Sequence, residues 1–110
     1  MPRRTVEVVP RPEVSDDLRN LGSRDLIREA LQYIVDLRNK PFLGRPLENL
    51  PHIGDLSDCR KIFFDEARYR IVYRLLPDEK NPTTVDVITV GPRAALGAYM
   101  TALTRLGRAK

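Results

Sequence analysis

The sequence predicts an α+β fold: a four-stranded, mainly antiparallel sheet with two N-terminal helices on one face and a C-terminal helix partly covering the other. The prediction has three grounds. A β-branched run opens the chain, apolar residues then recur at helical spacing, and three further strand-like runs precede a last helical stretch. A length of 110 residues suits one domain over residues 1–110. The expected order is β-α-α-β-β-β-α.

The N-terminal part contains the first strand and both early helices. Residues 5–9 are rich in β-branched side chains and stop at a proline, which predicts a short strand. A short helix is expected behind Ser15, because residues 14–21 carry apolar side chains at helical spacing. Ser23 is a second candidate N-cap, and the strongest apolar stripe in the chain predicts a longer helix over residues 24–39.

The C-terminal part supplies the rest of the sheet. Residues 41–56 are interrupted by Pro and Gly but hold scattered apolar side chains, which indicates an anchored connector and no domain boundary. Residues 58–64 and 68–76 then form a predicted hairpin, and residues 83–90 form the next strand. Gly and Pro end that strand and lead into a helix over residues 93–106.

The composition narrows the classes of function. Nineteen Lys and Arg against fifteen Asp and Glu give a net charge of +4, and the whole surplus lies after residue 86, which is compatible with a polyanionic partner. Cys59 alone cannot form an internal disulfide and is expected to be a buried strand residue, and with His52, expected in a loop, it cannot build a zinc site. We expect no metal, no cofactor, no secretory signal and no membrane span, hence a soluble cytoplasmic protein.

The predicted hairpin carries interleaved cations and aromatic rings. If the chain turns through Asp65 and Glu66, Lys61 lies directly opposite Arg70, and an anion between the two would relieve their repulsion. A shift of one residue in the register would instead separate the two cations across the sheet and leave both solvated. The sequence leaves the two registers open, because Asp-Glu matches the favoured two-residue turns poorly.

Two later residues have competing interpretations. Arg93 follows the last strand at a helix start, where backbone N–H groups favour an anion, but the same position suits an ordinary exposed arginine. Tyr99 belongs to the apolar stripe of the final helix, so packing in the core with its hydroxyl at the rim is the default.

Residues 59–73, with the sequence CRKIFFDEARYRIVY, and residues 87–93, VITVGPR, followed by Tyr99, resemble the RelE branch of the RelE/ParE toxin superfamily. Residues 44–50, GRPLENL, are similar to the connector that enters the hairpin in that family. The resemblance extends over about residues 5–106. It implies a bacterial toxin that enters the ribosomal A site, cuts the mRNA there and is silenced by a cognate antitoxin.

The resemblance also implies a site. The family's strand lysine, the arginine of its Tyr-Arg pair, the arginine after the last strand and the tyrosine of the final helix correspond to Lys61, Arg70, Arg93 and Tyr99. Lys61, its pKa lowered by nearby cations, would act as base or support the attacking 2′-oxygen. Arg70 would clamp the phosphate, Arg93 would stabilise or protonate the leaving side, and Tyr99 would stack on or orient a base. Further contacts to nucleic acid are expected from Arg60, Phe63 and Arg68.

Phe63 departs from the family pattern, which often has a second lysine there. This keeps open the alternative of an inactive relative that serves only antitoxin binding or autorepression. A second alternative, from a different class, is a ParE-like inhibitor of DNA gyrase. The strand lysine, strand arginine and helix tyrosine favour the nuclease. The expected partners are the antitoxin and the ribosomal A site with mRNA and ribosomal RNA, and no membrane contact is expected. The basic C-terminal residues Arg105, Arg108 and Lys110 would either bind ribosomal RNA or form a solvated tail.

Overall fold

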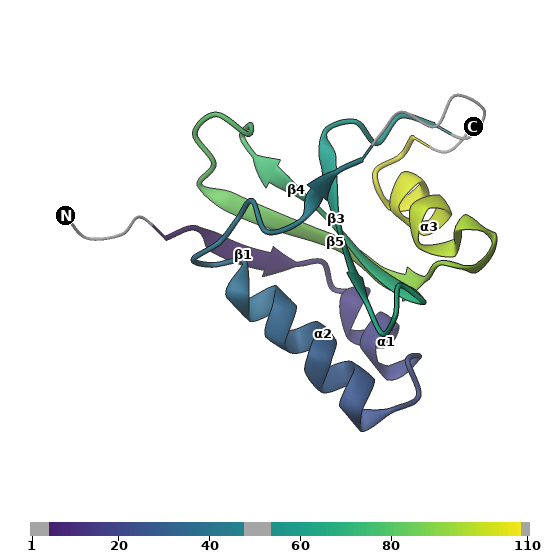
Figure 1. Cartoon of the computed structure of the whole chain (residues 1–110). Helices are drawn as coiled ribbons and strands as arrows, with labels where there is room; N and C mark the ends of the chain where they lie inside the picture. The colour runs from purple at the N-terminus through teal and green to yellow at the C-terminus, as the bar shows by residue number, and fades with distance from the viewer. Residues whose placement is uncertain (1–4, 48–53, 109–110) are drawn as a thin grey trace.

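The computed structural model describes residues 5–47 and 54–108, and within them the chain forms one mixed sheet between two layers of helices (Figure 1). The five strands are in the order β1-β5-β4-β3-β2; β1 runs parallel to β5, and the other pairs are antiparallel. The elements are β1 (Glu7–Pro10), α1 (Val14–Arg19), α2 (Arg24–Asp36), β2 (Arg45–Pro46), β3 (Cys59–Phe64), β4 (Tyr69–Leu76), β5 (Thr84–Pro92), the 3₁₀ helix η1 (Ala94–Leu96) and α3 (Gly97–Arg105).

The fold class is confirmed, but the predicted number of strands is too small. The additional strand, β2, pairs Arg45 with Lys61 and Pro46 with Arg60 at the edge of the sheet. A strand this short, in a segment rich in Pro and Gly, has neither β-branched residues nor alternation, so it gives no sequence signal. It covers part of the β3 edge, which the prediction left open.

The helices differ from the prediction mainly at their ends. Ser23 caps α2 as expected, because its side-chain oxygen accepts a hydrogen bond from the Leu26 N–H at 3.3 Å, although α2 ends at Asp36 rather than Asn39. In α1, however, Ser15 lies inside the helix, and Glu13 takes the N-cap position without a side-chain bond. The predicted start of α1 behind Ser15 is therefore wrong.

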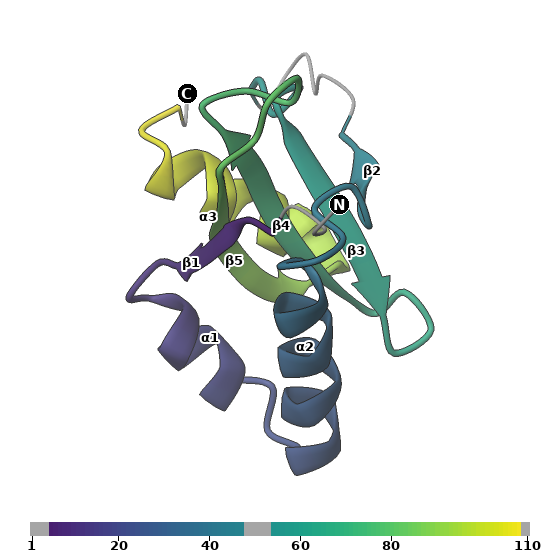
Figure 2. The same ribbon diagram turned by 90° about the vertical axis from the view of Figure 1, so that its left-hand side faces the viewer.

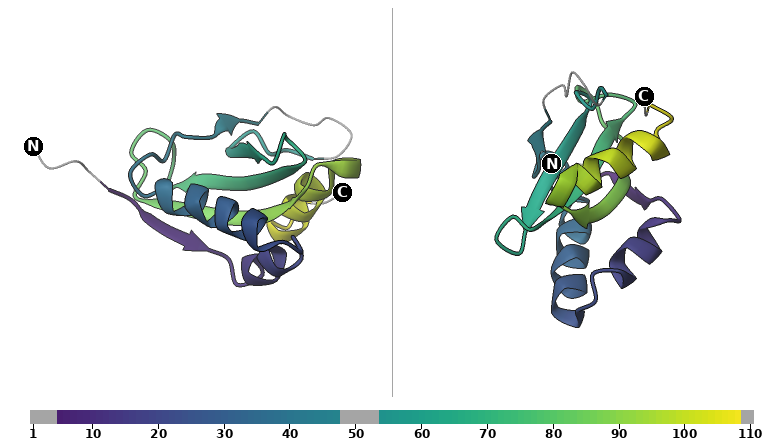
Figure 3. Two further views of the ribbon diagram at one scale, coloured as in Figure 1. Left: turned by 60° about the horizontal axis from the view of Figure 1, so that its bottom comes forward. Right: turned by 90° about the vertical axis from the view of Figure 1, so that its right-hand side faces the viewer.

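The two faces of the sheet carry separate cores. Helices α1 and α2 cover one face, as Figure 2 shows, and their apolar side chains pack on strand residues that include Ile71, Tyr73 and Val87. Helix α3 crosses the other face (Figure 3, right) and packs on Val72 and Ile88. Side chains alternate along each strand, so neighbours on β3 and β4 point into different cores.

The hairpin has a register that neither interpretation of the sequence foresaw. Phe64 pairs with Tyr69 around a turn formed by residues 65–68, so Arg70 lies opposite Phe63 and Lys61 lies opposite Val72. The direct apposition of Lys61 and Arg70 is thus wrong. The register is displaced by two positions from the expected one, and because the side-chain period of a strand is two, Lys61 and Arg70 still share a face.

The turn itself explains the displacement. Asp65, Glu66 and Ala67 all adopt left-handed backbone conformations, with φ of 53°, 54° and 65°. The Arg68 N–H closes the turn by donating to the Asp65 carbonyl at 3.0 Å. A run of non-glycine residues in this region is uncommon and has no recognisable sequence signature.

The predicted last helix is divided. After Pro92 the chain makes η1, then Leu96 takes a left-handed conformation with φ of 57°, and α3 begins at Gly97. The break redirects the chain so that α3 lies back across β4 and β5. Within residues 5–47 and 54–108 no helix has the length and apolar character needed to cross a membrane.

Candidate functional site

One end of the sheet face under α3 gathers most of the predicted site residues. Lys61 and Phe63 come from β3, Arg70 from β4, Arg93 from the junction of β5 and η1, and Tyr99 from α3. The alternation of β3 and β4 places the first three on the same face, and the division of the last helix brings Tyr99 over it. Four elements therefore build the cluster.

Arg70 is the centre of the cluster. Its guanidinium carbon lies 4.5 Å from the centroid of the Phe63 ring and 4.7 Å from that of Tyr99. One guanidinium N–H donates a hydrogen bond to the Tyr99 hydroxyl. The Arg70 Nε is buried and has no hydrogen-bond partner among the described residues. Aromatic faces attract a guanidinium through the negative charge of their π-systems, so these rings orient Arg70.

Lys61 and Arg93 flank this arrangement. The Lys61 Nζ lies 5.0 Å from the centroid of the Phe63 ring that Arg70 also contacts. The backbone N–H of Arg93 donates to the Arg68 carbonyl at 2.9 Å, which ties the start of η1 to the hairpin turn. A pocket of about 700 Å³ lies here, and three of its lining residues are Arg68, Arg70 and Arg93.

The centre of the cluster is positively charged. Within residues 5–47 and 54–108, neither Arg70 nor Arg93 forms an ion pair. Burial raises the pKa of Tyr99, and the charges of Arg70 and Arg93 oppose that rise only in part, so the phenol stays neutral at physiological pH. An anion of the size of a phosphate suits such a set of donors.

Tyr99 lies in the core under α3. Its side chain is only 4% exposed and packs in the α3 core with Ala102 and Leu103. The default interpretation, a core tyrosine with its hydroxyl at the rim, is confirmed. A ring buried in this way has little surface on which a base could stack, so its contact with Arg70 is the feature that connects it to the site.

Arg60 lies away from the cluster. It neighbours Lys61 on β3 and therefore points to the opposite face, where its guanidinium lies 4.9 Å from the Phe42 ring centroid. It donates to the Gly44 carbonyl at 2.7 Å and to Glu79 at 2.9 Å. The structure does not bring Arg60 together with Arg70, and its contact with nucleic acid stays a prediction.

Arg68 lies at the rim of the pocket. Its side chain is 67% exposed, with the Asp65 and Glu66 carboxylates each 3.6 Å away. Ion pairs that are this exposed hold an arginine weakly. Arg68 therefore remains available to a ligand in the pocket, as the prediction of a nucleic-acid contact requires.

The C-terminal arginines do not form a solvated tail. Arg105 binds the Asp17 carboxylate of α1 with both terminal nitrogens, at 2.5 and 2.9 Å, and Arg108 binds Asp58 at 2.6 and 2.9 Å. The prediction of a solvated tail is thus wrong for these two residues, because each has a carboxylate across the fold. Lys110 and His52 lie outside the described residues.

Sequence reasoning missed the groups that hold α3 in place. Asp17 also accepts hydrogen bonds from the Thr89 hydroxyl and the Val90 N–H, each at 3.1 Å, while Arg105 donates to the Ile88 carbonyl at 3.0 Å. The Asp17–Arg105 pair thus bonds to the edge of β5 beyond the end of β1. The available signal was weak: an acidic residue early in a helix is ordinary, since it favours the helix N-terminus.

Cys59 is a buried strand residue, as expected. Burial raises the pKa of its thiol to about 12, so the reactive thiolate is absent at neutral pH. Among the described residues no group of three or more His, Cys, Asp and Glu side chains is arranged to hold a metal ion.

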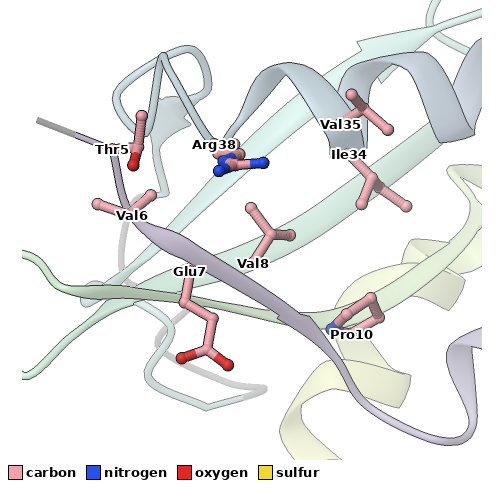
Figure 4. Close-up of a pocket in the computed structure, with 8 residues that line it drawn as sticks. All are labelled: Thr5, Val6, Glu7, Val8, Pro10, Ile34, Val35 and Arg38. Carbon is pink, nitrogen blue, oxygen red and sulfur yellow. The ribbon is translucent and has the colours of Figure 1, made fainter. Parts of the chain in front are cut away.

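A second hollow lies between β1 and α2. This groove has a volume of about 580 Å³, and its lining residues include Val8, Ile34, Val35 and Arg38 (Figure 4). The exposed face of α2 continues it with Leu31, which is 43% exposed. The groove is largely apolar and lacks the grouped cations of the cluster under α3, so the cluster is the candidate site.

Comparison with known proteins identifies the family. The sequence profile described as "ParE toxin of type II toxin-antitoxin system, parDE" matches residues 8–96. The chain therefore belongs to this family, within the RelE/ParE superfamily, and is a toxin of a type II toxin-antitoxin system. The matched range includes Lys61, Arg70 and Arg93 and ends before Tyr99. No curated protein matches the sequence significantly.

Solved structures of RelE toxins share the fold. A mutant of the Escherichia coli toxin RelE in the free state is 22% identical, with a TM-score of 0.69, over 93% of this chain and 98% of that chain. The isolated E. coli RelE toxin is 22% identical, with a TM-score of 0.60, over 92% and 98%. The toxin-antitoxin complex RelBE2 from Mycobacterium tuberculosis contains a chain that is 23% identical, with a TM-score of 0.62, over 81% and 99%.

Proposed function

We propose that this toxin is a ribosome-dependent mRNA endoribonuclease that inhibits translation without a metal cofactor. One observation carries the proposal: Arg70 and Arg93 line the same pocket, and among the described residues neither arginine forms an ion pair with a carboxylate. Lys61 contacts the Phe63 ring that Arg70 also contacts. Fixed cations aimed at one point stabilise the charge that develops on a phosphorane. A cluster of this kind suits phosphodiester chemistry better than a purely structural role.

The proposed reaction is attack of a ribose 2′-oxygen on the adjacent phosphorus. The 2′-oxygen loses its proton, the new O–P bond forms, and the bond to the 5′-oxygen breaks, leaving a 2′,3′-cyclic phosphate and a 5′-hydroxyl. Lys61 supports or deprotonates the attacking oxygen, and Arg70 binds the non-bridging oxygens in fork geometry. Arg93, at the open rim of the pocket, stabilises the negative charge on the leaving 5′-oxygen. That oxygen takes a proton from water at the rim and becomes the 5′-hydroxyl, while the proton of the 2′-hydroxyl passes to Lys61 or to water.

Tyr99 acts in this proposal through Arg70. Its hydroxyl accepts from the guanidinium, and its burial fixes the ring, so Tyr99 orients Arg70 rather than stacking on a base. Phe63 and Arg68 line the approach to the cluster. Because the ribosome would present the mRNA, the protein needs little sequence readout of its own.

The proposed partners follow from this function. A ribosomal substrate implies a cytoplasmic site of action and contacts with mRNA and ribosomal RNA. A cognate antitoxin is the second partner, supported by the structural match to a toxin-antitoxin complex.

Induced expression with primer extension on cellular mRNA tests the proposal. The wild-type protein is expected to produce discrete cuts within translated regions, and Arg70→Ala and Arg93→Ala are expected to abolish them. Arg28→Ala is the matched control, because Arg28 is an exposed arginine on α2 with only a 4.0 Å contact to Asp25. Intact mRNA under the wild-type protein would overturn the proposal.

Inhibition of DNA gyrase is the second candidate, favoured by one observation: the matching family profile is that of ParE toxins. The same expression strains distinguish the two functions. Loss of plasmid supercoiling with uncut mRNA would establish the gyrase inhibitor, and neither effect would indicate an inactive, antitoxin-binding relative.

A further inference from the structure

We propose that Phe63 is a positioning residue: its ring holds the Arg70 guanidinium at the pocket without neutralising it, so that the full charge of Arg70 is available to a phosphodiester. The identity of the ligand rests on the proposed function. The positioning itself rests on geometry that can be tested without any cleavage.

The hairpin register brings the two side chains together. Phe63 and Arg70 are direct partners across β3 and β4, on the face under α3. The guanidinium carbon of Arg70 lies 4.5 Å from the Phe63 ring centroid, within the distance of about 6 Å at which a ring face attracts a cation. Tyr99 contributes a second ring from α3, at 4.7 Å. Two neutral rings from different elements thus restrain one cation.

Arg60 shows what an arginine looks like when its charge is compensated. It also contacts a phenylalanine, Phe42, at 4.9 Å, but its Nε donates to the Glu79 carboxylate at 2.9 Å. Arg70 has the aromatic contact without the carboxylate, and its Nε is buried without a partner among the described residues. A carboxylate at Arg70 would compete with a phosphate for the same donors, whereas a ring does not.

Packing alone accounts poorly for Phe63. Its side chain is 37% exposed, and it belongs to neither buried core of the described residues. A single apolar side chain on a surface is ordinary, so the case for Phe63 rests on its specific contacts. Here the ring contacts Arg70 and the Lys61 ammonium, whose Nζ lies 5.0 Å from its centroid. A lysine at this position would repel both cations instead.

Two substitutions distinguish the effect of the aromatic π-system from that of the side-chain volume. Phe63→Leu keeps apolar volume and removes the π-system, whereas Phe63→Tyr keeps the ring face. Phe42→Leu is the matched control, because it removes a cation–aromatic contact of the same kind from Arg60. If Phe63→Leu fails to fold, Phe63→Met provides a second ringless variant.

The first readout is the NMR signal of the Arg70 Nε–H group in the full chain. The signal is assigned by its loss in Arg70→Lys. The same samples are titrated with inorganic phosphate to measure its affinity. In the wild type and Phe63→Tyr, the ring current is expected to shift this signal away from that of a free arginine. Phe63→Leu is expected to move it toward the free value and to weaken phosphate binding about tenfold. An unchanged Arg70 signal and unchanged phosphate affinity in Phe63→Leu would overturn the proposal.

The second readout is cleavage of ribosome-bound mRNA. Phe63→Leu is expected to lower kcat about tenfold with little change in KM, because ribosome contacts dominate binding, and Phe63→Tyr is expected to restore most of the rate. Equal rates for the wild type and Phe63→Leu would count against positioning. If the wild type cuts nothing, the proposed nuclease fails, and the NMR and phosphate results still decide the role of Phe63.

Discussion

Two arginines on one strand of this toxin have opposite surroundings. Arg70 and Arg74 lie on the same face of β4, but Arg74 pairs across the sheet with Asp86, and Arg70 pairs with Gly91. The Arg74 Nε donates to the Asp86 carboxylate at 2.9 Å, and Arg11 binds the same group at 3.0 and 3.1 Å. Among the described residues, the recorded partners of the Arg70 guanidinium are neutral: the Phe63 ring, and the ring and hydroxyl of Tyr99.

This difference separates structural cations from cations available to a ligand. Around Asp86 the positive charges are paired and serve to join β1, β4 and β5, and the Arg105 and Arg108 pairs similarly fix the end of α3. Among the described residues, Arg70 has no carboxylate partner of this kind. The α3 face thus has arginines paired with carboxylates at one end, and Arg70 without such a partner among the described residues at the other.

Arginine substitutions at these two positions should give opposite results. Arg70→Ala is expected to lower cleavage of ribosome-bound mRNA by about 100- to 1,000-fold, because it removes a donor to the phosphorane, while stability changes by less than about 1 kcal/mol. Arg74→Ala is expected to lower stability by about 1–3 kcal/mol and to leave the rate within a few-fold of the wild type. Single-turnover cleavage measures the rates of the two variants, and urea denaturation measures their stabilities. Equal losses of rate in Arg70→Ala and Arg74→Ala would contradict the distinction between the two arginines.

Breaking the Asp17–Arg105 pair is expected to give the largest loss of stability. Both side chains are mostly buried, at 11% and 16% exposure, and Arg105→Met would leave the Asp17 carboxylate without its counter-ion. We expect a loss of about 3 kcal/mol in the free energy of unfolding. Arg19→Met is the control. Arg19 is 75% exposed, so its ion pair with Asp16 should contribute less than about 0.5 kcal/mol to stability. Similar urea midpoints for the two variants would contradict the role of the pair.

A carboxylate opposite Arg70 should convert it into a structural arginine. Gly91 offers the position: a Cβ there would lie 3.6 Å from its nearest neighbouring atom, the Cα of Ala98, which is ordinary contact. Gly91→Asp is expected to lower the cleavage rate about tenfold relative to Gly91→Asn, which has the same shape without the charge. Equal rates for the two variants would show that the charge of Arg70 is not used.

The acid dependence of stability should be the smallest effect. Burial raises the pKa of Asp86, but hydrogen bonds from Arg11 and Arg74 outweigh it and hold that pKa below its ordinary value. Stability from such a carboxyl is present above its unfolded pKa of about 4 and is lost as pH falls through the folded pKa.

Urea midpoints measured from pH 6 downwards test this dependence. The wild type is expected to lose stability below about pH 4 more steeply than Asp86→Asn, which has no proton to bind there. Asp25→Asn, at an exposed position on α2, should follow the wild type. A slope that is identical in the wild type and Asp86→Asn would show that Asp86 does not contribute.

The sequence predicted the layers of the fold, but it did not predict the tight turn, the break in the last helix or the shortest strand. The apolar stripe of α2, its Ser23 cap and the β-branched run of β5 are strong local signals, so their positions were predicted closely. The left-handed turn at residues 65–67, the break at Leu96 and the short strand β2 depend on tertiary contacts and have no pattern to detect.

The candidate site residues were predicted from the family resemblance, whereas their surroundings in the fold were not predicted. Nothing in the pattern distinguishes Arg70 from Arg74, because both alternate with apolar residues on β4. Only the register of β5 decides that one meets Asp86 and the other Gly91. The contact of Tyr99 with Arg70 and the pairing of Arg105 with Asp17 likewise depend on how α3 is docked.

The central claim is that this cationic cluster cuts mRNA by attack of a ribose 2′-oxygen, and one substrate pair tests it most directly. Purified toxin is given ribosomes that carry the same mRNA with either ribose or 2′-deoxyribose at the mapped cleavage nucleotide. The account predicts rapid cutting of the ribose substrate to a 2′,3′-cyclic phosphate and no cutting of the deoxy substrate. Equal cutting of both substrates, or of neither, would contradict it.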